Sequence, residues 1–203
     1  MEQIIEFDSK PFPIIIIKNR FSEKELIQVT QELDFLTKDN KLKDFKVIAA
    51  YDEETDTSKR AAKHGAWLNT IYRNLTSSDI YRTTRSTLDL INEVETDEWF
   101  FTNMEASADS ILISYYDEGD YYKAHKDYAF ITAVTWLHRE PKGFEGGELV
   151  FTDYGMTIPI MNNTTVLFPS CIEHEVREIT NVDYEGGGRY AIIQFIHNID
   201  EYA

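Results

Sequence analysis

Residues 111–137 read ILISYYDEGDYYKAHKDYAFITAVTWL and contain three short apolar segments separated by turn residues. The segments 111–116, 121–125 and 130–137 are rich in β-branched and aromatic side chains, which is typical of strands. The sequence DEG at 117–119 is a turn signal between the first two segments. This stretch therefore predicts consecutive β-strands.

The same pattern of short apolar segments and turn residues continues through most of the remaining sequence. Further strands are predicted over 148–151, 165–168, 173–179 and 189–196, and glycine or asparagine turn signals separate most of them. Ahead of residue 110 the sequence predicts one buried strand at 13–18 and two helices. We therefore expect a mainly β fold with N-terminal helices, in which a double-sheet jelly roll is supported by helices on one side. We expect one domain over 1–203, with N-terminal support over 1–109 and the β core over 110–200.

The two helices have recognisable starting signals. Ser22 and Glu25 form a capping box at the start of the first helix, and the second is expected to start near Ser77 or Ser78. The polar stretch 51–64 between them has no apolar face, so it is expected to be a solvated loop, and a role as a functional lid is left open. The buried faces are expected to carry Leu26, Val29, Leu33 and Leu36 in the first helix, and Ile80, Thr84, Leu88 and Ile91 in the second.

Charge and cysteine content restrict the partners and the compartment. The 203-residue chain has 36 acidic and 20 basic residues and a formal net charge of −16, which disfavours nucleic acid and anionic membrane surfaces as partners. Cys171 is the only cysteine, so no intrachain disulfide and no cysteine-based zinc cluster can form. The N-terminal segment lacks the basic region of a signal peptide, and the longest apolar run, 14–17, is too short to span a bilayer. We expect a reducing compartment, with the cytoplasm as the default.

A candidate metal site follows from the end of the strand 121–125. Because side chains alternate across a strand, His125 and Asp127 emerge on one face about 7 Å apart at their Cα atoms. His174, after the apolar run 166–169, is a suitable third ligand. Two histidines and one carboxylate on one face of an octahedron form the ligand set of non-haem iron(II) oxygenases, although such a set also accepts zinc or manganese.

Arg189 is a second candidate site residue, because it begins the otherwise apolar strand 189–196. An arginine there can point inward only if an anion meets it, since an unpaired buried charge is costly. A dicarboxylate is a suitable anion, because a guanidinium binds a carboxylate bidentately. The alternative is an edge arginine whose head group reaches solvent.

From about residue 111 to residue 197 the chain resembles the prolyl-hydroxylase-like branch of the 2-oxoglutarate/iron(II) dioxygenases. The resemblance covers somewhat under half of the chain, and it depends on the combination of several stretches. They are YYDEGDYYKAHKD at 115–127, GGELVF at 146–151, LFPS at 167–170 with HEV at 174–176, and GRYAI at 188–192. The family fold is a double-stranded β-helix, a jelly-roll variant, which agrees with the predicted strands.

The resemblance implies a role for each site residue. It identifies His125, Asp127 and His174 as iron(II) ligands. It identifies Arg189 as the residue that binds the distal carboxylate of 2-oxoglutarate, and Tyr115 matches a cosubstrate-side tyrosine of some members. The implied cofactors are Fe(II), 2-oxoglutarate as cosubstrate and O₂, with ascorbate as an optional addition.

The chain departs from the family pattern around the cosubstrate. Trp136 stands where several relatives have a cosubstrate-binding tyrosine, and its indole N–H can donate a hydrogen bond but cannot accept one. Ile193 occupies a position where some relatives have a hydroxyl residue, and residues 181–188 lengthen the interval between His174 and Arg189. These departures bear on cosubstrate binding and leave the iron ligands intact.

The implied reaction is a coupled oxidation, in which 2-oxoglutarate is converted to succinate and CO₂ while an unactivated C–H bond is hydroxylated. Asp127 favours hydroxylation, because halogenating relatives have a small residue in place of this carboxylate. The expected substrate is a prolyl residue in a peptide or protein, and a free amino acid or other small molecule is the alternative. Two rival classes are a cupin-like metalloenzyme that does not use 2-oxoglutarate and a non-catalytic module. The sequence does not identify the substrate or the oligomeric state.

Overall fold

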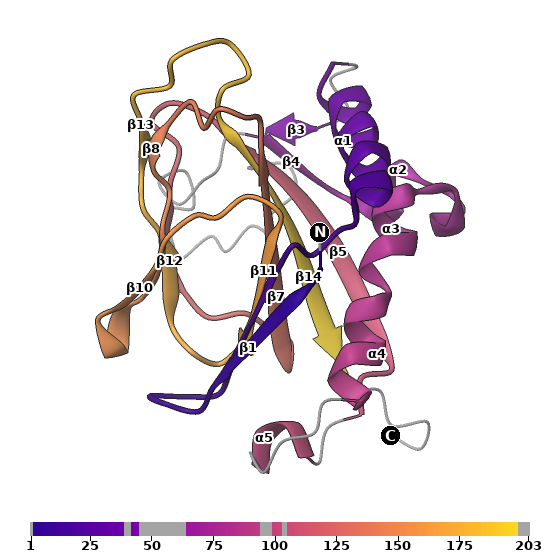
Figure 1. Ribbon diagram of the computed structural model, residues 1–203, viewed down its shortest axis with the longest axis vertical. Helices are drawn as coiled ribbons and strands as arrows, with labels where there is room; N and C mark the ends of the chain where they lie inside the picture. Colours follow the sequence, from indigo (N-terminus) through magenta and orange to yellow (C-terminus); the bar gives the residue numbers. More distant parts are fainter. Residues whose placement is uncertain (1, 39–41, 45–63, 94–98, 103–104, 199–203) are drawn as a thin grey trace.

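The computed structural model describes residues 2–38, 42–44, 64–93, 99–102 and 105–198. Two antiparallel sheets pack against each other, and helices cover the outer face of the larger sheet (Figure 1). This arrangement confirms the expected jelly-roll architecture with helical support on one side.

The larger sheet has the strand order β1-β2-β11-β7-β14-β5-β4-β3. The smaller sheet has the order β10-β9-β12-β6, and β8 pairs with β13 in a separate ladder. The strands of the larger sheet are β1 (Ile4–Asp8), β2 (Ile14–Lys18), β3 (Lys43–Asp44), β4 (His64–Trp67), β5 (Ala108–Tyr116), β7 (Ile131–His138), β11 (Thr164–Pro169) and β14 (Arg189–His197). The remaining strands are β6 (Tyr122–His125), β8 (Glu145–Gly146), β9 (Leu149–Phe151), β10 (Met156–Ile158), β12 (His174–Val176) and β13 (Ile179–Thr180).

The central strands β7 and β11 of the larger sheet are buried on both faces, which explains why they lack a polar face. On the inner face, Leu112 of β5 and Val134 of β7 pack in one cluster with Leu149 of the smaller sheet. The neighbouring residues Ile113 and Ile131 point the other way and pack beneath the helices. The cavity described below therefore lies between the two sheets, away from the helical layer.

The helices α1 to α4 lie along the outer face of the larger sheet (Figure 1). The capping box predicted at the start of α1 is confirmed: the Ser22 hydroxyl and the Ser22 N–H donate to the Glu25 carboxylate at 2.6 and 2.9 Å. Of the four residues expected to be buried, Val29, Leu33 and Leu36 are buried, and Leu26 is partly buried. The helical segments are α1 (Glu23–Lys38), α2 (Leu68–Ile71), α3 (Asp79–Thr84), α4 (Ser86–Glu93) and α5 (Trp99–Thr102), with short 3₁₀ turns at Leu75–Ser77 and Thr152–Tyr154.

The second expected helix is present, but it is divided into α3 and α4 at Arg85. Its N-cap is Ser78, whose hydroxyl accepts a hydrogen bond from the Tyr81 N–H at 3.0 Å. Around the division the Thr83 and Ser86 hydroxyls donate to backbone carbonyls at 2.8 and 3.0 Å, which competes with regular helical hydrogen bonding. The face expected to be buried, with Ile80, Thr84, Leu88 and Ile91, is buried on both sides of the division.

Several elements had no clear signal in the sequence. The hairpin strand β1 pairs with β2, and the short strand β4 extends the sheet by pairing with β5. Segments from the N-terminal half therefore form both edges of the larger sheet. The predicted strand 173–179 is divided into β12 and β13, which pair with different strands. Most of the possible lid 51–64 lies outside the described residues, and His64 begins β4.

Among the described residues, no helix is both long enough and apolar enough to cross a bilayer.

Replacing Ser22 with alanine is expected to lower the free energy of unfolding by about 1 kcal/mol at neutral pH, because the start of α1 loses its cap. The Ser22 hydroxyl holds the pKa of Glu25 below its ordinary value of 4.5. The contribution of this carboxylate is therefore present above pH 4.5 and is lost as the pH falls through the lowered pKa of the folded state. Denaturant unfolding of both proteins at neutral and acidic pH measures the effect.

The matched control is Ser77→Ala, because Ser77 is exposed and lies in the 3₁₀ turn at Leu75–Ser77. Its effect should stay within about 0.5 kcal/mol. A Ser22→Ala protein that is as stable as the wild type at neutral pH would contradict the capping role.

Candidate active site

Strand pairing in the smaller sheet brings the two predicted histidine ligands together. His125 is the last residue of β6, and in the antiparallel register it lies opposite His174, the first residue of β12. Their ring centroids are 4.3 Å apart. Asp127 follows β6 by two residues, and its backbone N–H donates to the Ser170 carbonyl at 3.0 Å. Residues from two distant parts of the chain thus meet at one end of the smaller sheet.

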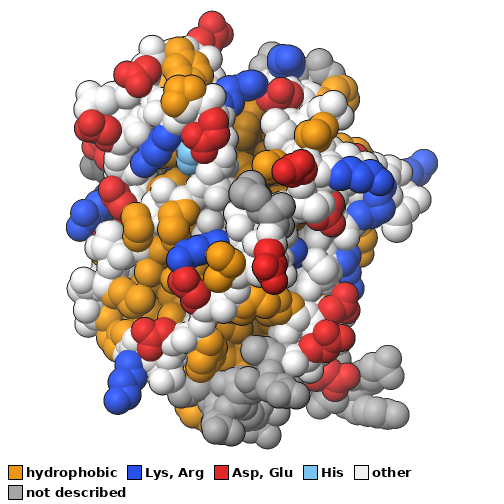
Figure 2. Space-filling view, in the orientation of Figure 1, with side chains coloured by type: hydrophobic (Ala, Val, Ile, Leu, Met, Phe, Trp, Pro, Cys, Tyr) orange, Lys and Arg blue, Asp and Glu red, His pale blue; other side chains and the backbone are white. Residues whose placement is uncertain are grey.

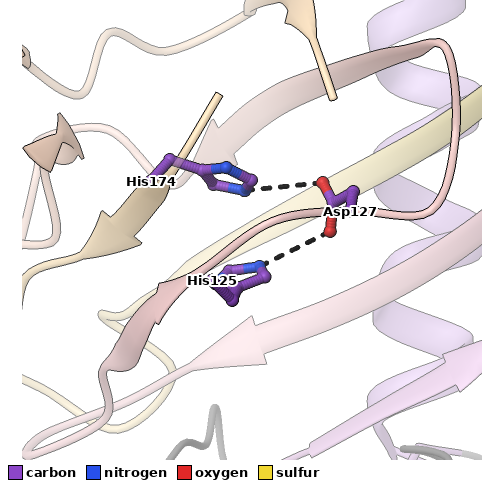
Figure 3. A group of neighbouring side chains, drawn as sticks. All are labelled: His125, Asp127 and His174. Atoms are coloured by element: carbon purple, nitrogen blue, oxygen red, sulfur yellow. Dashed lines mark ion pairs between the residues drawn. The ribbon is translucent and has the colours of Figure 1, made fainter. Parts of the chain in front are cut away.

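The three side chains converge on one point (Figure 3). The His125 Nε2 is 3.5 Å from the Asp127 Oδ1, and the His174 Nε2 is 3.4 Å from the Asp127 Oδ2. One donor atom from each residue lies within 4.8 Å of the others, a spacing that permits a single metal ion. The side chains are 17%, 11% and 5% exposed for His125, Asp127 and His174, so the group is shielded but reaches solvent on the His125 side.

Backbone carbonyls determine which nitrogen of each histidine is available. The His125 Nδ1 lies 2.8 Å from the Lys123 carbonyl, and the His174 Nδ1 lies 2.9 Å from the Ile172 carbonyl. A carbonyl only accepts, so each Nδ1 carries the proton and each Nε2 keeps a free lone pair. Both free lone pairs are on the side of Asp127, which is the arrangement expected of histidine ligands.

The protonation states also fit a metal site. Burial lowers the pKa of His174 to about 4, and the neighbouring His125 acts in the same direction, so the His174 imidazole is neutral near pH 7. Burial alone would raise the pKa of Asp127, but its contacts with His125, His174 and Thr132 lower it overall. The group therefore offers neutral imidazole and an ionised carboxylate, which is the donor chemistry of non-haem iron(II) sites.

Arg189, at the start of β14, is a buried cation with few partners. Only 1% of its surface is exposed, and burial lowers its pKa to about 10 despite the opposing effects of Tyr116 and Glu148. Its Nη2 donates to the Gly147 carbonyl at 3.2 Å, and its guanidinium carbon lies 4.3 Å from the centre of the Tyr116 ring. Its Nε and Nη1 have no hydrogen-bond partner among the residues that the structure describes. This arrangement suits an anion with two acceptor atoms, such as a carboxylate.

One cavity of about 80 Å³ between the sheets contains both the histidine–aspartate group and Arg189. Its remaining lining is mainly apolar, with a few hydroxyl groups. A small, largely apolar cavity with a few convergent polar groups is the usual form of a ligand site. The other lining residues are Leu112, Ser114, Tyr116, Tyr122, Thr132, Val134, Trp136, Leu149, Val176, Ala191, Ile193 and Phe195.

The structure brings most of the predicted cosubstrate residues into this cavity, but not Tyr115. Trp136 and Ile193 line it, as the sequence pattern implied. Tyr115 lies on the opposite face of β5, where its ring packs 4.9 Å from that of Tyr190. Its neighbour Tyr116 faces the cavity instead, because adjacent residues of a strand point to opposite faces. Tyr116 therefore replaces Tyr115 as the cosubstrate-side candidate.

Two polar residues near Asp127 had not been identified from the sequence. Thr132 lines the cavity, and its hydroxyl donates to the Asp127 Oδ2 at 2.6 Å. Ser170 lies 2.8 Å behind it, measured between the two hydroxyl oxygens. Period-two alternation back from Trp136 would have placed Thr132 on the cavity face, whereas nothing local pointed to Ser170.

The comparisons with known proteins agree with this geometry. The family model described as the 2OG-Fe(II) oxygenase superfamily matches residues 111–197, as the resemblance predicted. No curated protein matches the chain significantly by sequence.

Solved structures share the fold. A Pseudomonas putida prolyl-4-hydroxylase superposes with a TM-score of 0.65 at 17% identity, covering 91% of this chain and 92% of that one. The viral collagen prolyl hydroxylase vCPH from Paramecium Bursaria Chlorella virus-1, solved as a 2OG complex, gives a TM-score of 0.50 at 14% identity, covering 92% and 96% of the two chains.

Apo-protein is expected to bind one iron(II) per chain, and His174→Ala should weaken that binding by more than about 100-fold, because two remaining ligands cannot define the coordination geometry. Anaerobic calorimetry with iron(II) measures this effect. The control is His197→Ala, which removes a histidine at the far end of β14 and should leave affinity unchanged. Equal affinity of the His174→Ala and wild-type proteins would exclude His174 as a ligand.

Replacing Arg189 with lysine is expected to weaken binding of 2-oxoglutarate by about 10- to 100-fold, because lysine keeps the charge but loses one charge-assisted hydrogen bond. Iron(II) binding should survive, since Arg189 is not among the metal-binding side chains. Titration of metal-loaded protein with 2-oxoglutarate tests this expectation.

The control is Arg139→Lys, which alters a surface arginine paired with Asp34 and should not change cosubstrate affinity. Unaltered affinity in the Arg189→Lys protein would place the carboxylate site elsewhere.

Proposed function

We propose that this chain is a 2OG-Fe(II) oxygenase that hydroxylates prolyl residues of peptides or proteins, starting from the match of residues 111–197 to the model of that superfamily. This match implies the use of iron(II), 2-oxoglutarate and O₂. One observation supports the assignment most strongly: a histidine–aspartate group and a buried, incompletely paired arginine share one cavity. A metalloenzyme that did not use 2-oxoglutarate would have no need for Arg189 in this position.

Each part of the cavity has a role in the proposed reaction. His125, Asp127 and His174 would hold the iron, and Arg189 would hold the distal carboxylate of the cosubstrate. When bound, iron and 2-oxoglutarate supply the oxidising chemistry, with succinate, CO₂ and a hydroxylated product as the outcome. The apolar walls exclude water from the reacting groups, which limits unproductive side reactions.

Retention of Asp127 favours hydroxylation over halogenation. The carboxylate is ionised, directed at both histidines and held by the Thr132 hydroxyl, so it is arranged as a ligand. With this position occupied by protein, the metal has fewer sites for an additional halide.

The surface charge supports a peptide substrate of basic character. The chain has a net charge of −16, and acidic side chains are spread over the visible face of the molecule (Figure 2). Such a field attracts a cationic peptide and repels a phosphate backbone. The similarity in fold to the two prolyl hydroxylases points to proline as the residue modified, although it does so only by analogy.

Exposed aromatic side chains next to the metal group also support this proposal. Tyr128 directly follows Asp127 and is fully exposed, and Phe130 is 52% exposed. Exposed apolar side chains that lie close together often mark an interaction site. Proline-rich segments dock on aromatic surfaces in several peptide-binding domains. We therefore assign Tyr128 to the substrate-binding surface.

A free amino acid is the second candidate substrate. Such a substrate needs only a small closed pocket and a few polar contacts, and the metal group is largely shielded from solvent.

With iron(II), 2-oxoglutarate and O₂ supplied, succinate formation is expected to increase when a basic, proline-containing peptide is added. The peptide should gain one oxygen atom by mass spectrometry, and its KM should rise with added salt, because screening weakens attraction to the acidic surface. Strong coupling to free amino acids, with none to the peptides, would exclude the peptide hypothesis and leave the oxygenase class intact.

The same assay includes a test of Tyr128. Tyr128→Ala should raise the KM for the peptide by about 3- to 10-fold, the value of one aromatic contact, without altering the KM for 2-oxoglutarate. The matched control is Phe35→Ala, because Phe35 is 49% exposed on α1, on the other side of the larger sheet.

A further inference from the structure

A chain of two buried hydroxyl groups leads away from the metal-binding carboxylate. The Thr132 hydroxyl donates to the Asp127 Oδ2 at 2.6 Å, and the Ser170 hydroxyl lies 2.8 Å from the Thr132 hydroxyl. Thr132 and Ser170 are both 0% exposed. Both residues lie outside the metal-binding group, yet one touches its carboxylate directly and the other supports that contact.

The donor and acceptor in each of these two hydrogen bonds can be assigned by counting protons. An ionised carboxylate only accepts hydrogen bonds, so the single Thr132 hydroxyl proton is directed at Asp127. The Thr132 oxygen can then only accept from Ser170, which must donate. Each hydroxyl in such a chain polarises the next, so the contact at Asp127 is stronger than an isolated threonine would give.

Backbone hydrogen bonds fix the position of Ser170. Its N–H donates to the Phe130 carbonyl at 3.0 Å, and its carbonyl accepts from the Asp127 N–H at 3.0 Å. Ser170 thus holds both ends of the segment 127–130, and its side chain supports the threonine that follows this segment. Asp127 is therefore held at two places: Ser170 binds its backbone N–H, and Thr132, supported by Ser170, binds one of its carboxylate oxygens.

We propose that Thr132 and Ser170 are positioning residues that orient the Asp127 carboxylate toward the iron. This proposal rests on the proposed function, because it gives Asp127 the role of an iron ligand. Groups that hydrogen-bond to metal ligands hold them in the coordinating orientation, and their loss typically lowers metal affinity or activity about 10- to 100-fold.

The fold contains a matched pair for comparison. Thr135 of β7 and Thr165 of β11 also form a buried hydroxyl–hydroxyl contact, 2.6 Å long, whereas Ser170 lies directly after the end of β11. Neither residue lines the cavity or contacts a metal-binding side chain. A variant that breaks the Thr135–Thr165 contact therefore shows how much stability a buried hydroxyl contact contributes when Asp127 is not affected.

The test compares Thr132→Val, Thr132→Ser and Thr135→Val, and each protein is first checked for folding by thermal unfolding. Anaerobic titration of apo-protein with iron(II) is expected to show about a 10- to 100-fold loss of affinity in Thr132→Val. Thr132→Ser retains the hydroxyl and should restore affinity close to the wild-type value. Thr135→Val should be destabilised to a similar extent but bind iron(II) normally.

Two further measurements separate positioning from general destabilisation. With cobalt(II) in place of iron(II), the visible absorption spectrum reports the ligand geometry and should change in Thr132→Val but not in Thr135→Val. In turnover, Thr132→Val should form more succinate per hydroxylated product, because a misplaced ligand uncouples the two reactions. If Thr132→Val does not fold, Ser170→Ala tests the same chain while keeping the backbone hydrogen bonds, with a smaller loss of affinity expected.

Equal iron(II) affinity and equal cobalt(II) spectra in Thr132→Val and wild type would overturn the proposal, as would equal effects of Thr132→Val and Thr135→Val. The metal titration does not depend on turnover. A wild-type protein that binds iron(II) but does not consume 2-oxoglutarate would therefore refute the proposed reaction while the affinity comparison still decides the positioning role.

Discussion

The pairing of β14 with β5 on one side and β7 on the other determines which side chains reach the cavity. In this register Arg189 lies opposite Tyr116, and Ala191 and Ile193 follow it on the same face. A shift of one residue would turn Tyr190 inward and move Arg189 beneath the helices. The chemistry of the cavity therefore depends on a ladder of backbone hydrogen bonds more than on any single side chain.

The buried arginine in the cavity is opposite in sign to the net charge of the whole chain. The net charge is −16, yet the most deeply buried charged group in the cavity is the Arg189 cation. The Tyr116 ring and the Gly147 carbonyl offset only part of the cost of burying it. The acidic exterior disfavours approach of a dicarboxylate, so binding depends on the interior contact, and an anion that cannot reach Arg189 gains nothing from the protein.

The parts of the site that depend on local sequence could be predicted, and those that depend on long-range pairing could not. His125 and Asp127 followed from strand alternation, and Arg189 from its position in an apolar strand. His174 meets His125 only through the β6–β12 pairing, so its place after an apolar run made it a suitable candidate, and the resemblance to a family was needed to assign it. The choice between Tyr115 and Tyr116 could not be made, because β5 is apolar on both faces and shows no period-two pattern. In the fold, β1 and the four-residue β4 were missed, because an exposed edge strand and a very short strand have no distinctive pattern.

The double attachment of the segment 127–130 to Ser170 has a consequence for how this enzyme can diversify. The segment that carries Asp127 is attached to Ser170, directly after β11, through backbone groups, which do not depend on side-chain identity, and the Tyr128 side chain between the two attachments extends into solvent. Residues at the surface of this segment can therefore vary without displacing the metal-binding atoms. Such modularity separates substrate choice from the oxidative chemistry, and it gives protein engineers a short, structurally bounded segment in which to alter specificity.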